Sequence, residues 1–379
     1  MKSLFWTTAL AGSLFATTAL SGALERAAPN TTRILFEEGT YIEVSGALIF
    51  PSLSGEGDDF GGAFVAPGTD TGDLLSTFAQ IGAAVKFDLT DRISGAVIFD
   101  QPNGVDTFYP GEFAPGSGFA GTNADYTSRQ FSFIGAFDVT KNITAYAGVR
   151  LDSVDADAEF DFTPILSGGA LGPYSIEAAN DLGVGWLAGA AFQIPSIALR
   201  LAVTYYSNVD FSHDTLEIFE GSTPLLMTET NLSTPDSVTI DFQTGVAPNT
   251  LLFGSVRWVD WSTFSIEPPL FTGSLGVPLV DFDEDFYTFN LGLGYRFSDK
   301  WSAALTGTFE PETGQTLTTL GPIDGRIGFG LGATYQATEN LRITGGFNYT
   351  SLSNAENFSG TEFDGGEAFG LGLRVGVSL

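Results

Sequence analysis

The sequence predicts an all-β fold, a transmembrane antiparallel β-barrel of about 14 strands with a short N-terminal plug-like segment. The chain of 379 residues has a formal net charge of −30, yet only 16% of its residues are charged and its mean hydropathy is +0.15. Its strand-like segments alternate apolar and polar residues with a period of two. After Ala23 no apolar run reaches the ~18–20 residues of a membrane helix, which leaves a barrel as the structure able to span a membrane.

The first 23 residues have the features of a secretory signal peptide. Lys2 supplies a positive charge, an apolar stretch extends from Leu4 to Leu20, and the small residues 21–23 follow it. A short buried helix is the alternative interpretation. Cleavage near Ala23 implies an exported chain, and the absence of cysteine excludes disulfides and thiolate metal sites.

The lipid-facing pattern is clearest at the C-terminus. In "FGLGLRVGVSL" (residues 369–379) an apolar residue occupies every second position, with glycine, arginine and serine between. "YTFNLGLGYRF" (residues 287–297) has the same pattern, with tyrosine and phenylalanine on the apolar face. Such segments would turn one face to lipid and the other to a lumen that tolerates polar side chains.

Short polar turns divide the chain at residues 90–92, 140–142, 194–196, 247–249, 298–300 and 338–340. These six turns join twelve strands, and one more strand at each end makes fourteen; twelve or sixteen strands are the alternatives. The predicted strands are 41–50, 78–89, 93–101, 126–139, 143–154, 182–194, 197–208, 237–247, 250–261, 285–297, 301–310, 325–337, 341–352 and 368–379. Residues 24–40 remain as a short hatch-like segment, and residues 41–379 form the barrel.

The order and spacing of three segments resemble the FadL/TodX family of outer-membrane transporters for long-chain fatty acids and other hydrophobic compounds. The segments are "APNTTRILFEEGTYIEVSGALIFPSLSG" near the start, "VIFDQPNG" in the third strand and "DFQTGVAPNTLLFGSVRWVDWSTF" across the eighth and ninth strands. The resemblance covers the mature chain. It implies an N-terminal plug, a ligand pocket inside the barrel, a lateral opening in the wall and a location in the bacterial outer membrane. Two departures are "APN" in place of an Asn-Pro-Ala element and the terminal Leu379 in place of an aromatic residue.

A proline interrupts the third predicted strand. Pro102 cannot donate a ladder hydrogen bond, so it belongs at a strand end, an edge or a bulge. In the resembled family the third strand is kinked inward and leaves a gap through which ligand exits. We therefore expect a lateral opening shaped by Asp100, Gln101, Pro102 and Gly104. The alternative is that Pro102 simply begins an outer loop.

Eight of the 15 lysines and arginines fall on the predicted lumen face or its rim: Lys86, Arg150, Arg200, Arg257, Arg296, Arg326, Arg342 and Arg374. Inward placement follows because a charge facing lipid at mid-membrane costs about 2–4 kcal/mol. Arg150, Arg257 and Arg374 are expected at similar depth, and a guanidinium binds a carboxylate bidentately. They are candidate ligands for a substrate carboxylate in the lumen. The alternative is that they pair with lumen acids and brace the barrel.

Two long connections, residues 155–181 and 209–236, mix apolar residues with acids. Exposed apolar clusters of this kind mark capture sites for hydrophobic ligands. The candidates for a loop capture groove are Phe160, Phe162, Ile165, Leu166, Leu225, Leu226 and Met227. The alternative, which is compatible with capture, is that the loops pack on one another and close the end of the barrel.

Catalytic and metal sites lack their usual parts in this sequence. His213 is the only histidine and lies in a predicted loop, and there is no cysteine, so nucleophilic triads and zinc sites are not expected. The acidic segment 281–286 could bind a divalent cation through its carboxylates, but it lacks EF-hand spacing, and a solvated loop is the favoured interpretation. We expect no enzymatic activity, no cofactor and no bound metal.

The favoured hypothesis is a passive outer-membrane transporter (channel) for long-chain fatty acids or other hydrophobic compounds. Ligand would be captured at the loops, enter a lumen pocket and leave sideways. The expected partners are hydrophobic small molecules (fatty acids or hydrocarbons) and outer-membrane lipid, with the chain as a monomer. The acidic charge argues against nucleic acid. A general diffusion porin and a structural or adhesive barrel are the alternatives.

Overall fold

The computed structural model describes residues 23–57, 68, 70–110, 121–161, 167–358 and 360–379. The predicted signal peptide up to residue 22 lies outside this part of the chain, as do Phe162, Ile165 and Leu166 of the predicted capture groove. Within the described residues, no helix is long and apolar enough to cross a bilayer.

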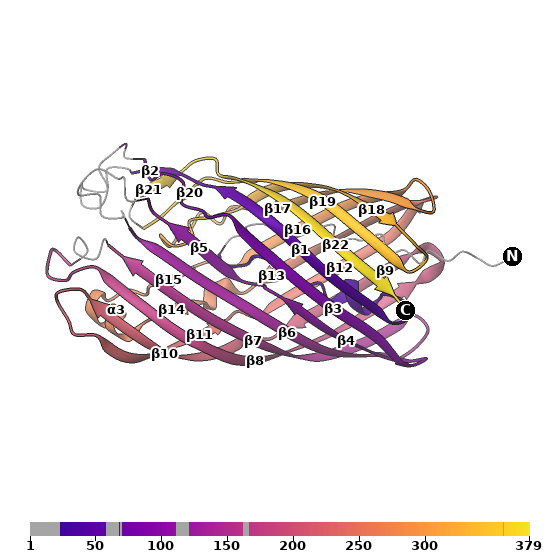
Figure 1. Cartoon of the computed structure of the whole chain (residues 1–379), viewed down its shortest axis with the longest axis horizontal. Helices are drawn as coiled ribbons and strands as arrows, with labels where there is room; N and C mark the ends of the chain where they lie inside the picture. Colours follow the sequence, from indigo (N-terminus) through magenta and orange to yellow (C-terminus); the bar gives the residue numbers. More distant parts are fainter. Residues whose placement is uncertain (1–22, 58–67, 69, 111–120, 162–166, 359) are drawn as a thin grey trace.

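Antiparallel strands form one closed barrel (Figure 1). They are β1 (Tyr41–Ser52), β3 (Phe78–Thr90), β4 (Ile93–Asp100), β5 (Gly104–Phe108), β6 (Asn123–Asp138), β7 (Ile143–Phe160), β8 (Tyr174–Ile194), β9 (Leu199–Tyr206), β10 (Val209–Phe219), β11 (Leu226–Thr234), β12 (Ser237–Ala247), β13 (Thr250–Val259), β16 (Phe286–Arg296), β17 (Trp301–Glu310), β18 (Arg326–Gln336), β19 (Leu341–Leu352) and β22 (Glu367–Ser378). β1 pairs with β3 on one side and with β22 on the other, which closes the sheet. The 17 segments make 14 barrel strands, because β4 and β5, β9 and β10, and β11 and β12 are each one interrupted strand.

The predicted strand number and the predicted short turns are confirmed. The turns lie at the same end of the barrel as the C-terminus, which we call the terminal end (Figure 1). At the opposite end, the loop end, lie α3 (Pro269–Leu275), β14 (Ser265–Ile266), β15 (Val280–Asp281), β2 (Gly55–Gly57), β20 (Ala355–Glu356) and β21 (Thr361–Phe363). The other short helices within the described residues are α1 (Thr31–Leu35), η1 (Pro195–Ile197) and η2 (Trp261–Thr263).

Three connections predicted as loops are partly strand. β7 and β8 extend into residues 155–181, β10 and β11 form a hairpin within residues 209–236, and β5 continues the third strand. His213 therefore lies on β10, where its Nδ1 is 2.8 Å from the carbonyl oxygen of Ala179, and not in a loop. The loop prediction was wrong because acids occupy the outward positions of these strands. In a strand that faces lipid, the same positions would carry apolar side chains.

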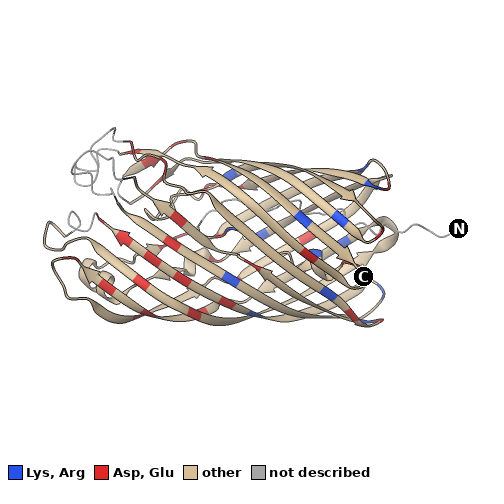
Figure 2. Ribbon diagram, in the orientation of Figure 1, with Lys and Arg blue, Asp and Glu red and all other residues tan. Residues whose placement is uncertain are grey.

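The outer face of the barrel becomes acidic toward the loop end (Figure 2). Asp106, Asp125, Asp157 and Glu177 lie directly opposite one another across β5, β6, β7 and β8. Like charges in direct opposition destabilise a sheet, and charges facing lipid are costlier still. This part of the wall therefore projects beyond the lipid, in agreement with the 18 residues of β7 and the 21 of β8, where ~9–11 span a bilayer.

Aromatic side chains fill the loop end from within. Phe160 packs against Tyr174 and Phe271 at ring-centroid distances of 6.4 and 5.9 Å. Phe160 is 1% exposed, so the prediction that it lines an exposed groove is wrong. Its position on β7 faces the interior, where burial of a large aromatic surface is favourable.

The connection between β17 and β18 folds into the barrel and closes it further. The Thr107 hydroxyl donates to the carbonyl oxygen of Leu320 at 2.8 Å, and the Tyr109 hydroxyl donates to that of Thr319 at 2.8 Å. Leu320 and Ile323 join the same buried cluster as the loop-end aromatic residues. The connections 155–181 and 209–236 also pack on each other, since the rings of Tyr174 and Phe219 are 5.1 Å apart, as one of the two interpretations of the sequence expects.

Glu217 holds α3 over the loop end. The Tyr174 hydroxyl donates to its carboxylate at 2.7 Å, and the backbone N–H groups of Leu270 and Phe271 donate at 3.1 and 3.2 Å. Burial and the Glu217 carboxylate raise the pKa of Tyr174, so the phenol remains a donor at neutral pH. One buried carboxylate therefore joins β8, β10 and α3.

Changing Glu217 to Ala is expected to loosen α3. Buried donors of α3 and Tyr174 would lose their acceptor, at about 1–3 kcal/mol for each unsatisfied group. Limited proteolysis should then cleave residues 260–285 at least tenfold faster than in the wild type, while the barrel itself stays folded. The exposed Glu229, changed to Ala, is the matched control; equal cleavage rates in the two variants would contradict the assignment.

Candidate functional site

The N-terminal segment, residues 23–40, lies inside the barrel. Three ion pairs connect it to strand residues, namely Glu25–Arg257 at 2.7 Å, Arg33–Glu43 at 2.5 Å and Glu37–Arg342 at 2.5 Å. Ile34 and Leu35 of α1 belong to a buried cluster with lumen-facing residues of several strands. The short segment thus has both charged and apolar contacts with the wall.

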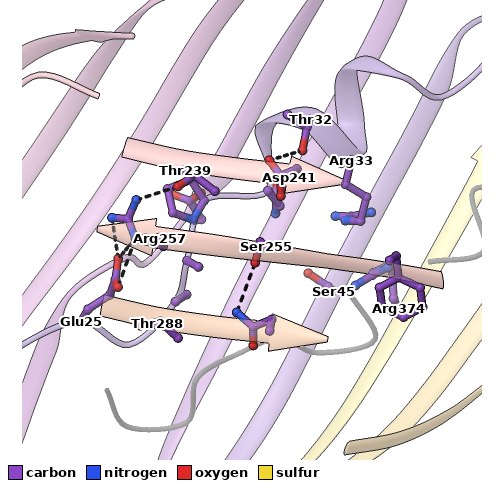
Figure 3. A pocket seen from close by; sticks show the side chains of 18 of the residues that line it. Glu25, Thr32, Arg33, Ser45, Thr239, Asp241, Ser255, Arg257, Thr288 and Arg374 are labelled. Atoms are coloured by element: carbon purple, nitrogen blue, oxygen red, sulfur yellow. Dashed lines mark hydrogen bonds and ion pairs between the residues drawn. The ribbon is translucent and has the colours of Figure 1, made fainter. Parts of the chain in front are cut away.

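A cavity of about 190 Å³ lies between this segment and the wall. Figure 3 shows side chains that line it, with Glu25 and Arg257 pointing toward each other and Thr32 bonded to Asp241. β1, β3, β12, β13 and β16 supply most of the wall around it. Many lining residues carry polar side chains, but apolar atoms provide the larger part of the cavity surface, with Ile81, Phe242 and Phe253 as the large apolar members.

The structure brings two of the three predicted carboxylate-binding arginines to this cavity. Arg257 and Arg374 line it, whereas Arg150 is not among the lining residues. Arg150 instead donates to the Ser207 carbonyl at 3.3 Å, and both Arg150 and Arg257 approach the ring of Tyr206, at 5.7 and 5.8 Å from its centroid.

Acids of the chain itself already engage the two lining arginines. Arg257 forms an ion pair with Glu25, and Nε of Arg374 lies 3.5 Å from Glu43, which also binds Arg33. This arrangement fits the interpretation in which the arginines brace the barrel. Sequence reasoning missed Glu25 and Glu43 as partners because it placed no acid opposite a particular arginine.

Arg200 is a further cation of the cavity that sequence reasoning did not select as a ligand. It lines the cavity, stacks over Phe36 with its guanidinium carbon 4.0 Å from the ring centroid, and lies 3.4 Å from Gln193 Oε1. Among the described residues no carboxylate forms an ion pair with it within 4.0 Å. Its lumen-facing position on β9 was the available sequence signal.

The third barrel strand is interrupted next to the cavity. β4 ends at Asp100 and β5 begins at Gly104, so Pro102 lies within the strand and does not begin an outer loop. The N-terminal segment binds this interruption, since the N–H groups of Arg26 and Ala27 donate to the Pro102 carbonyl at 2.7 and 3.0 Å. The kink and the segment therefore hold each other in place.

The interruption leaves part of β3 without a strand partner on the side of the third barrel strand, although β1 pairs with it on the other side. Pairing between β3 and β4 ends at Ala83 and Phe99, and the next bridge toward the loop end joins Leu75 to Thr107. We call the stretch between these two pairs the lateral interval; it consists of residues 76–82 and residues 100–106.

A few hydrogen bonds cross the lateral interval. The Ile81 N–H donates to Gln101 Oε1 at 2.9 Å, and Gln80 Nε2 donates to the Gln101 carbonyl at 3.4 Å. Nearer the loop end, the Ser76 N–H donates to the Asp106 carbonyl at 3.4 Å. Side chains thus replace most of the ladder that continuous strands would form.

Arg26 fills the middle of the lateral interval. Its guanidinium carbon lies 4.2 Å from the ring centroid of Phe78 on β3. A Cβ added at Gly104 on β5 would lie 2.7 Å from the same guanidinium, so a residue without a side chain lets Arg26 approach the wall. Arg26 therefore reaches from the lumen into the break between the two strands.

The cavity reaches the lateral interval from inside. Gln80, Ile81, Gly82, Asp100 and Gln101 line it, and all five belong to the interval. Ile81 is also 59% exposed on the barrel surface. Of the four residues predicted to shape a lateral opening, Asp100 and Gln101 border the cavity, while Pro102 and Gly104 bind or accommodate the N-terminal segment.

The described residues of the predicted capture groove separate into two places. Phe160 is buried in the loop-end core, whereas Leu225, Leu226 and Met227 are exposed at the β10–β11 hairpin, with Met227 83% exposed. The structure therefore does not bring Phe160 together with the hairpin residues on one surface. An apolar hairpin tip remains as the exposed part of the set.

Comparison with known proteins gives a family match and structural similarities. The family described as "Outer membrane protein transport protein (OMPP1/FadL/TodX)" matches residues 67–369. Among solved structures, the chain is similar to a Pseudomonas aeruginosa FadL homologue, with 13% identity, 91% of this chain and 92% of that chain covered, and a TM-score of 0.74. No curated protein sequence matches the chain.

Two further solved structures share the fold. The Pseudomonas putida toluene transporter TodX has 10% identity, 95% of this chain and 98% of that chain covered, and a TM-score of 0.67. The Ralstonia pickettii toluene transporter TbuX has 14% identity, 90% of each chain covered, and a TM-score of 0.62. Since the family match spans most of the sequence and the fold agrees, this chain is an outer-membrane β-barrel that belongs to the FadL/TodX family of transport proteins.

Proposed function

We propose that the protein is a passive transporter of hydrophobic compounds whose solutes leave the lumen sideways through the lateral interval. The observation that supports this most strongly is the cavity, whose lining includes residues of the interval on both β3 and β4. A solute at this position needs only local displacement of Gln101 and Arg26 to contact the lipid. Burial of its apolar surface in the bilayer, at about 25 cal/mol per Å², would drive the step.

The size of the cavity favours compact solutes. Its volume of about 190 Å³ is smaller than the ~300–1,000 Å³ typical of pockets for drug-sized ligands. A single aromatic ring or a short alkyl chain suits this space, and the toluene transporters with the same fold point to the same class. Long-chain fatty acids, the other substrate class that the sequence suggests, would require the N-terminal segment to move.

The exposed hairpin residues fit a role in first contact. Leu225, Leu226 and Met227 present apolar surface at the loop end, beyond the acidic part of the wall. We assign these residues to capture of the solute.

The lumen arginines have a structural role in this proposal. Arg150, Arg257 and Arg374 position the N-terminal segment and the wall, and direct contact with a solute carboxylate is the alternative role. We assign no enzymatic step to the protein, and we propose that it acts as a monomer.

Changing Arg26 to Ala is expected to speed the exit of a bound hydrophobic dye. The variant loses the stacking of the guanidinium on Phe78, an interaction of about 0.5–2 kcal/mol, and empties the middle of the interval. Stopped-flow transfer of the dye from the reconstituted barrel to lipid should accelerate about 3–30-fold. The control is Arg129 changed to Ala, because this exposed arginine of β6 pairs with Asp155 outside the lumen.

Vesicle transport tests the proposed function as a whole. Lipid vesicles that contain the barrel should take up toluene faster than protein-free vesicles, with no uptake of a hydrophilic sugar of similar mass. Sugar uptake with a stable ionic conductance in planar bilayers would support the general diffusion porin, to which the polar side chains around the cavity are also suited. Absence of both activities would overturn transport through this barrel.

A further inference from the structure

We propose that the edge of the cavity at the lateral interval is a subsite for a hydrogen-bond donor, so that the preferred solutes are compact hydrophobic molecules with one hydroxyl group. The inference rests on the proposed function and adds the class of solute. It is carried by two acceptor atoms, Gln80 Oε1 and Asp100 Oδ1. Both residues line the cavity, one from β3 and one from the end of β4.

Both oxygen atoms are buried without a hydrogen-bond partner among the described residues. Gln80 is 7% exposed, and its amide orientation is fixed because Nε2 donates to the Gln101 carbonyl at 3.4 Å. Its oxygen is therefore the free end of the group. A buried acceptor without a donor is unfavourable, so two of them at one edge form an unsatisfied site.

The surroundings extend the acceptor character of this edge. Asp100, Gln130 and Asp152 lie opposite one another across β4, β6 and β7, and Gln130 Nε2 donates to Asp152 Oδ2 at 3.1 Å. Asp152 Oδ1 is a further buried oxygen without a partner in the described structure. The charged groups that act on Asp100 are Asp152 and Arg150, of opposite sign.

Three kinds of solute meet this edge differently. A hydroxyl group donates to Gln80 or Asp100 and satisfies it. A hydrocarbon leaves the acceptors unpaired, and a site built to bind a hydroxyl discriminates against the analogue that lacks it. A carboxylate has no proton to donate to either acceptor.

Arginines on the other sides of the cavity provide the competing interpretation. Nε of Arg33 has no partner among the described atoms, and Arg200 has no ion pair there. Nη1 and Nη2 of Arg33 each donate a hydrogen bond to Glu43, and Arg257 is bound to Glu25. A solute carboxylate would have to compete with these acids, whereas a hydroxyl solute displaces no protein partner at Gln80.

Three ligands with the same tolyl body test the assignment: toluene, 4-methylphenol and 4-methylbenzoate. Their binding to the full detergent-folded barrel is measured by calorimetry at pH 7, where the phenol is neutral and the benzoate is charged. We expect 4-methylphenol to bind about tenfold more tightly than toluene, and 4-methylbenzoate to bind most weakly. Changing Gln80 to Leu or Asp100 to Leu should reduce this preference, and changing both should bring the affinities for phenol and toluene to within about twofold of each other.

Gln243 changed to Leu is the matched control, because this glutamine lines the same cavity from β12 and its Nε2 donates to the Ala198 carbonyl at 3.3 Å. The control should keep the preference for phenol.

Three outcomes would contradict the proposal. Equal wild-type affinities for toluene and 4-methylphenol would overturn the subsite, because its oxygens would then be hydrated, but the proposed transport function would stand. Tightest binding of 4-methylbenzoate would overturn it in favour of the arginines. Absence of binding by all three ligands would refute the proposed function itself.

Discussion

Changing Glu25 to Ala should release the N-terminal segment from the lumen. The side chains of Arg257 and Glu25 are 9% and 6% exposed, and they meet at 2.7 Å. Removal of one partner from a buried ion pair costs about 3–5 kcal/mol, because the remaining charge is left in a poorly solvated site. Much of that cost should fall on the docking of residues 23–40, since Glu25 is their contact with β13.

Hydrogen exchange measures this release directly. The N–H groups of Arg26 and Ala27, bound to the Pro102 carbonyl, should lose protection by at least about 100-fold in the Glu25 variant. The double variant Glu25→Ala with Arg257→Met should lose less, because no buried charge remains. Unchanged protection in the single variant would show that the ion pair does not hold the segment.

Much of the barrel could be predicted from the sequence because membrane strands follow simple physical rules. Alternation with a period of two located the lipid-facing strands, and the short polar turns fixed their order. Prediction failed where the wall leaves the lipid, as on β10 and β11, since acids replace apolar residues on the outer face there. The inward position of Phe160 also depends on where β7 continues, which the loop-like acidic sequence concealed.

The site was predictable only in part. Pro102 marked the interruption of the third strand, because a proline cannot join a ladder. The partners of the arginines were not predictable, since Glu25 and Arg257 are far apart in the sequence and meet only when the N-terminal segment enters the lumen. The same is true of Arg26, whose place between Phe78 and Gly104 depends on that segment.

Locking the lateral interval should stop lateral exit. Leu75 and Thr107 are bridge partners at its loop end, and directly opposed antiparallel residues have Cα atoms about 4.5–5.5 Å apart. This separation lies within the ~4.4–6.8 Å that a disulfide spans. The natural chain has no cysteine, so Leu75→Cys combined with Thr107→Cys introduces a single pair of thiols.

The lock acts because the interval must widen for a solute to pass. Its terminal end is already held where Ala83 pairs with Phe99, and the disulfide would fix its loop end as well. Residues 100–106 could then not move away from residues 76–82. A matched pair, Gly294→Cys with Ala304→Cys, joins opposed residues of β16 and β17, where the wall has no interruption.

The most direct test of lateral exit is the rate of toluene uptake into vesicles that contain the Leu75→Cys, Thr107→Cys barrel, before and after reduction. If solutes leave through the lateral interval, oxidation lowers the rate at least about tenfold, a barrier of about 1.4 kcal/mol or more, and a reducing agent restores it. The pair on β16 and β17 should transport equally well in both redox states. Uptake that is unaffected by oxidation of the Leu75 and Thr107 pair would contradict lateral exit and place the path through the terminal end of the barrel.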